Sequence, residues 1–174
     1  MFNLEFLMLI LTGTYLVTPF LDMFMLTGIE GVDYYGEVHQ SKLNCWIHTI
    51  GMPFTFYGIS CWVPALLNLS KENRAKMQYY VWTVYFAHYL SIDFWQGMLC
   101  TICYFWSMLF ANEKVSGNIS NWNLFNHGFI VSFTALICQE IFGHYIGGDD
   151  PSRFEGVPNA VMYATYFSTN HIFD

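Results

Sequence analysis

Charged residues are scarce in this sequence. Lysine and arginine together number six and aspartate and glutamate thirteen, so charged side chains make up only 11% of the 174 residues. A soluble domain usually has about a quarter of its residues charged. The shortage argues against a soluble domain, and a content of 55% hydrophobic and 20% aromatic residues indicates a membrane protein.

The sequence also gives no sign of a nucleic-acid-binding surface or of a disulfide framework. The formal net charge is −7, and the acids are scattered along the chain, so we expect no nucleic-acid partner. The five cysteines lie in or beside apolar stretches without framework spacing, which predicts packing roles. We interpret the C-x-x-C pair of Cys100 and Cys103 as incidental, because the surrounding run is so apolar.

The sequence does contain long runs without a charged residue. They cover residues 43–70, 94–112, 115–139 and 156–173. Each is near or above the ~18 residues that make a membrane-spanning helix. We therefore expect an all-α fold in one domain over residues 1–174, a polytopic transmembrane bundle of about five to six helices.

Turn residues and charges divide these runs into expected helices. The second span contains Pro53 and Pro64 and follows an acidic loop over residues 27–43. We expect the apolar stretch over residues 77–110 to form a hairpin of two helices, and a single tilted span is the alternative. The first span lacks the positively charged start of a signal peptide, so we expect it in the mature protein. The expected spans are residues 4–26, 44–69, a two-helix hairpin within 77–110 that turns near Asp93, 124–145 and 157–173.

The hairpin would sort polar residues to the two sides of the membrane. The positive-inside rule makes the side with Lys71, Arg74, Lys76 and Lys114 cytosolic, against Lys42 and Arg153 on the other. His127 lies seventeen residues before His144, or ~25 Å along a helix, so these two cannot share an ion. The residues expected toward the non-cytosolic face are His39, His48, Asp93, Glu140, His144 and Glu155.

The stretch from His39 to Pro53 gathers two histidines and an amide at the start of an uncharged run. Asn44 and His48 are four residues apart and share a helix face if the helix begins near Lys42. His39 would point to the opposite side of an unbroken helix, so the imidazoles can converge only if His39 folds back from the preceding loop. Two imidazoles there suit half of a site for iron or zinc. Alternatively, His48 is a neutral core residue and His39 a solvated loop residue.

A second group of polar residues follows in the 124–145 span. Glu140 and His144 are also four apart, and Glu155 follows a turn rich in glycine and aspartate. Ionisable groups within a span are costly and indicate a site or a polar relay. Glu140 could equally be a hydrogen-bonded residue between helices, and Glu155 a solvated loop acid.

The two groups resemble the motifs of a family of small endoplasmic-reticulum membrane proteins whose characterised fungal member is an iron(II)-dependent 2-hydroxy-fatty-acid dioxygenase. The first motif, H-x-x-x-x-N-x-x-x-H followed by proline, is His39, Asn44, His48 and Pro53. The second is Gln139 to His144, then Glu155 and Pro158. This chain departs from the family in having Glu140 four residues before the histidine, a longer interval before Glu155, and an altered ending after Pro158.

The resemblance implies α-oxidation of a 2-hydroxy long-chain fatty acid with iron(II) and dioxygen, which shortens the acid by one carbon. It implies His39, His48 and His144 as iron ligands, with Glu140 or Glu155 as a fourth ligand or a group that orients a ligand. Asn44 would fix His48 or contact the substrate hydroxyl. It also implies a fatty-acyl substrate, membrane lipid around the chain, and an endoplasmic-reticulum location.

Two other functions are alternatives to this one. Membrane di-iron hydroxylases and desaturases have arrays of H-x-x-x-H and H-x-x-H-H boxes, whereas this chain has six histidines and no such box. A membrane scaffold or small transporter could keep the fold without a metal. Under that alternative the histidines of the two groups need not meet, whereas an enzyme requires them to meet.

Overall fold

The computed structural model describes residues 8–9, 12–13, 15–17, 19, 36, 39–150, 162–164, 166–167 and 169. Within these residues the fold is all-α, as the sequence predicts. The expected spans over 4–26 and 157–173, and the loop over 27–43, lie largely outside the described residues. The long elements are α3 (Lys42–Leu66), α4 (Lys71–Ile92), α5 (Phe94–Val115), α6 (Asn121–Cys138) and the π-helix η1 (Gln139–Tyr145), which continues α6.

Each α-helix of this set begins at a side chain that caps its first turn. The side-chain oxygens of Ser41, Ser70, Asp93 and Ser120 each accept a hydrogen bond from the backbone N–H three residues later. These caps satisfy amides that a helix leaves unpaired at its start. Asp93 ends α4 and caps α5, so the predicted hairpin turn is confirmed.

Helix ends differ from the predicted ones where local contacts outweigh hydropathy. α3 ends at Leu66 rather than at residue 69, because Asn68 adopts a positive φ of 51° and a left-handed residue stops a helix. α5 continues past the predicted end at residue 110 to Val115, which packs in one buried cluster with Leu124 of α6.

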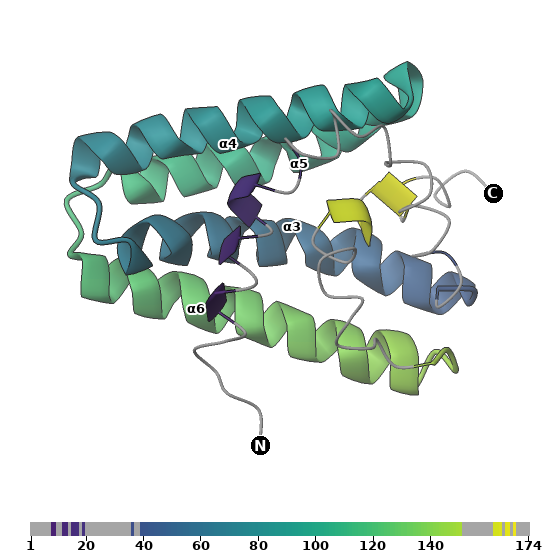
Figure 1. The fold of residues 1–174 in the computed structure, drawn as a ribbon. Coiled ribbons are helices and arrows are strands. Elements are labelled where there is room, and N and C mark those ends of the chain that lie inside the picture. The colour runs from purple at the N-terminus through teal and green to yellow at the C-terminus, as the bar shows by residue number, and fades with distance from the viewer. Residues whose placement is uncertain are drawn as a thin grey trace.

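α3 is the central helix of the bundle (Figure 1), and it packs against α4, α5 and α6. Successive helices run in opposite directions, joined by short turns. The start of α3, the Asp93 turn and the end of η1 therefore lie together at one end of the bundle. Residues far apart in the sequence meet at that end.

α3 and α6 approach closely where two glycines face each other. A Cβ added to Gly58 would lie 2.5 Å from the carbonyl oxygen of Gly128, and one added to Gly128 would lie 2.5 Å from that of Gly58. Small residues let helix backbones come this near. The contact lets α6, which continues into η1, pack closely against α3.

Aromatic rings dominate the core between α3, α4 and α5. The ring of Phe56 lies between 5.0 and 6.2 Å, centroid to centroid, from the rings of Tyr15, Trp82, Tyr85 and Tyr104. Tilted and edge-to-face pairs of this kind stabilise a core beyond the area they bury. Phe56 lies two turns after His48 on α3, so the segment that carries this histidine continues directly into the core.

Large apolar side chains also cover the outside of the bundle. Trp95, Trp106 and Ile130 are 79%, 63% and 63% exposed. Two helices in the described part of the chain, α5 and the continuous segment Asn121–Tyr145, are long and apolar enough to cross a membrane. The larger number of spans expected from the sequence stays a prediction.

Candidate metal centre

His39 folds back onto α3 from the residues that precede it. Its ring is 2% exposed, and its centroid lies 4.5 Å from that of His48. The backbone N–H of His39 donates to the carbonyl of Gly36 at 3.2 Å, and its own carbonyl accepts from the Cys45 thiol at 3.5 Å. The fold-back that the sequence required for convergence is confirmed.

His144 completes the group from the opposite side. It lies in η1, is 1% exposed, and its ring centroid is 4.6 Å from that of His39 and 5.2 Å from that of His48. One ring nitrogen from each of the three residues lies within 4.8 Å of the others. Imidazole is the commonest side-chain ligand for transition metals. The three buried histidines could therefore hold a metal ion.

Asn44 is fully buried between the histidines and the loop that follows η1. Its side-chain nitrogen lies 3.4 Å from Nδ1 of His144 and donates to the Asp149 carboxylate at 2.8 Å. The resemblance implies that Asn44 would fix His48 or contact the substrate hydroxyl, and this stays a prediction. The structure places the amide nitrogen of Asn44 close to His144.

The π-helix turns Gln139 and His144 toward α3. Gln139 is 1% exposed and its side-chain nitrogen donates to Thr55 Oγ1 at 2.9 Å. In an α-helix, residues five apart point about 140° away from each other, whereas the wider π turn brings them closer to one face. The inward polar residues of this segment are therefore Gln139 and His144, five apart, rather than two residues four apart.

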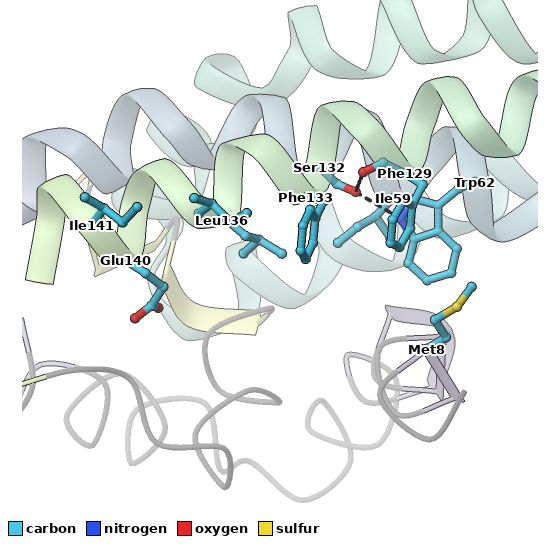
Figure 2. Close-up of a pocket in the computed structure, with 10 residues that line it drawn as sticks. Met8, Ile59, Trp62, Phe129, Ser132, Phe133, Leu136, Glu140 and Ile141 are labelled. Carbon is cyan, nitrogen blue, oxygen red and sulfur yellow. Dashed lines mark hydrogen bonds between the residues drawn. The ribbon is translucent and has the colours of Figure 1, made fainter. Parts of the chain in front are cut away.

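Glu140 lies on the wall of an apolar cavity of about 390 Å³ (Figure 2). Glu140 is not among the described residues that lie close enough together to hold an ion, because that set consists of the three histidines alone. Glu155, the other acid predicted as a ligand, lies outside the described residues, and so does Pro158. The cavity is lined by Met8, Ile59, Trp62, Phe129, Ser132, Phe133, Leu136, Ile137, Glu140 and Ile141.

The other described histidines are not part of this group. His127 accepts or donates a hydrogen bond with the Tyr57 hydroxyl at 2.8 Å. His88 packs against the rings of Tyr89 and Tyr163, at 5.7 and 5.8 Å. These placements agree with the prediction that His127 and His144 cannot share an ion. His171 lies outside the described residues.

Asp149 is a polar residue of this region that the sequence did not single out. Burial raises the pKa of its carboxyl, but hydrogen bonds from Ser41, Asn44 and Gln40 outweigh that effect, so the net pKa is lowered. One feature could have indicated such a role for an acid. The first turn of α3 contains no acid of its own, although a negative charge is favourable there. An acid from elsewhere in the chain could fill that role.

Comparison with protein-family models, with curated proteins and with solved structures found no match for this chain.

Proposed function

We propose that this protein is a membrane enzyme that uses a three-histidine iron(II) centre to shorten 2-hydroxy long-chain fatty acids by one carbon. The observation that carries the proposal is the meeting of His39, His48 and His144, with ligand atoms within 4.8 Å of one another. A scaffold has no need to bury three imidazoles together. The resemblance of the two sequence motifs supplies the reaction, and the geometry supports a metal.

The donor set fits iron(II). Imidazole nitrogen suits iron, zinc, copper and nickel, and three protein ligands leave coordination positions open for other molecules. When bound, iron(II) would supply the one-electron chemistry that lets dioxygen react with a closed-shell organic acid. The chain itself keeps bulk water from the histidines, since each is at most 5% exposed.

The apolar cavity suits the acyl chain of such a substrate. It is walled by α3, α6 and Met8, and its members Glu140 and Ile141 lie about one turn before His144 on η1. An acyl chain needs an apolar channel, while its carboxyl and hydroxyl need polar partners. A substrate lying along α6 would place its polar end toward the histidines.

The overall reaction balances without a separate reductant. The bond between the first two carbons breaks, the carboxyl carbon leaves as carbon dioxide, and the hydroxyl-bearing carbon becomes the new carboxyl group. One dioxygen is consumed and one water is released. The substrate supplies all the electrons, so the chain needs no second redox cofactor for this reaction.

The outer surface supports a membrane location. Exposed tryptophan and tyrosine side chains occur at helix ends on both sides of the bundle. Trp46 and Trp95 lie close to the starts of α3 and α5 and Tyr145 ends η1, whereas Trp122 lies in the first turn of α6. Such residues are enriched at the two membrane interfaces. We place the histidines just beneath the headgroups, and the resemblance favours the endoplasmic reticulum.

Oxygen uptake tests the proposal. Purified protein in detergent would be loaded anaerobically with iron(II) and mixed with aerated buffer and a 2-hydroxy long-chain acid. We expect oxygen consumption and a product one carbon shorter, detected by mass spectrometry. His144→Ala should abolish both, and His127→Ala, on the same continuous segment, should retain both.

Two results would overturn the proposal. The first is wild-type protein that binds iron(II) but consumes no oxygen with the acid, which would leave a metal site of another function. The second is wild-type protein that binds no metal, which would favour the scaffold or transporter.

A further inference from the structure

The carboxylate of Asp149 joins the two parts of the chain that carry the histidines. Oδ2 accepts hydrogen bonds from the backbone N–H groups of Gln40 and Ser41, both at 3.0 Å, and from the Asn44 side chain at 2.8 Å. Oδ1 also accepts from the Ser41 N–H, at 3.1 Å. Both oxygens of one acid are therefore engaged with the start of α3.

A two-glycine turn brings Asp149 to this position. The N–H of Gly148 donates to the carbonyl of His144 at 2.9 Å, and Gly148 has a φ of +86°, where a side chain would be strained. A Cβ on Gly147 would overlap the carbonyl of Gly143 and lie 3.1 Å from Ser41 Oγ. The chain thus reverses tightly after His144 and returns to α3.

The groups that Asp149 binds are next to the candidate ligands. Gln40 and Ser41 directly follow His39, so holding their amides fixes the backbone that carries that ring. Asn44, held by the same carboxylate, has its amide nitrogen 3.4 Å from Nδ1 of His144. One side chain therefore supports His39 through the backbone and His144 through an amide.

We propose that Asp149 is a positioning residue that holds His39 and His144 in the arrangement needed for metal binding. It is not itself a ligand, because its oxygens are occupied by amide donors and the set of residues close enough to share an ion does not include it. Groups that orient metal ligands usually contribute about tenfold to a hundredfold to metal affinity. The inference rests on the proposed metal centre and is independent of which substrate is oxidised.

Cobalt(II) binding tests this role without relying on turnover. Metal-free protein in detergent would be titrated anaerobically with cobalt(II), and the visible absorption bands of the bound ion would report affinity and coordination. We expect Asp149→Asn to weaken binding by about tenfold or more and to alter the bands. Asp150→Asn removes the same charge at the exposed neighbouring position and should match the wild type.

A second variant covers the case in which Asp149→Asn fails to fold, which circular dichroism would show. Asp149→Glu keeps the charge but displaces the carboxylate by one methylene, so we expect an affinity between those of the wild type and Asp149→Asn. Wild-type affinity and bands in both folded variants, or in Asp149→Glu if it alone folds, would overturn this inference alone. Wild-type protein that binds no cobalt(II) or iron(II) would overturn the metal centre, and this inference with it.

Discussion

Gly143 lies against the side chain of Asn44 so closely that a Cβ added to the glycine would overlap the amide oxygen of Asn44. The same Cβ would approach the His48 ring at 3.4 Å. The space between α3 and η1 is therefore filled at this level, and a side chain at residue 143 would separate the two helices that carry His48 and His144.

Replacing Gly143 with alanine should damage the proposed metal centre more than the rest of the fold. Overpacking of a filled site costs about 1–3 kcal/mol, and here the strain falls on Asn44, which contacts His144. We expect weaker cobalt(II) binding with the helix content retained, measured by titration and circular dichroism. Gly13→Ala is the matched control, since nothing lies within 4 Å of a Cβ at that position. Unchanged cobalt(II) binding in Gly143→Ala would contradict the close contact.

Replacing Gly128 with alanine should instead weaken the whole bundle. A Cβ there would lie 2.5 Å from the Gly58 carbonyl and 2.7 Å from the Cys61 Cβ, so α3 and α6 would have to move apart along their length. We expect a lower melting temperature in detergent, by an amount that corresponds to about 1–3 kcal/mol. A melting temperature equal to that of the wild type would show that the two helices can part without cost.

The histidine arrangement shows how far the sequence could predict the site. Counting residues along a helix gave the condition under which His39 and His48 meet, and the structure meets it with a buried His39 before the cap of α3. The count could not say that the condition would be met. The residues next to His39 make hydrogen bonds with Asp149, which comes from a distant part of the chain.

The π-helix and the contacts of Asp149 could not be predicted from the sequence, for two different reasons. Hydrophobic spacing is read with a period of 3.6 residues, and nothing in the spacing of residues 139–145 signals a wider turn, so Glu140 rather than Gln139 was paired with His144. Asp149 and Asp150 are the same residue type in one loop. Only the geometry shows that the first accepts hydrogen bonds from α3. The helices themselves were predictable because their caps and uncharged runs are local features.

The neighbours Glu140 and Gln139 should respond differently to substitution. Glu140 lies on the cavity wall, so Glu140→Gln should leave cobalt(II) affinity and melting temperature unchanged. Gln139→Ala removes donors to Thr55 and to the Ala135 carbonyl at 2.9 and 3.1 Å and should lower stability by about 1–3 kcal/mol. Loss of cobalt(II) binding in Glu140→Gln would show that this carboxylate is a ligand after all.

The lowered pKa of Asp149 predicts how its contribution to stability depends on pH. The carboxylate is stabilised in the folded protein by the amides of Ser41, Gln40 and Asn44, so its folded pKa lies below the usual 3.8. A group whose pKa is lowered by folding stabilises fully above its unfolded pKa and loses that effect as the pH falls through the folded value. The difference in melting temperature between wild type and Asp149→Asn should therefore stay constant from pH 7 to about pH 5 and shrink only in more acidic solution. A difference that already disappears between pH 7 and pH 5 would mean that a group with a higher pKa, rather than the Asp149 carboxylate, holds the start of α3.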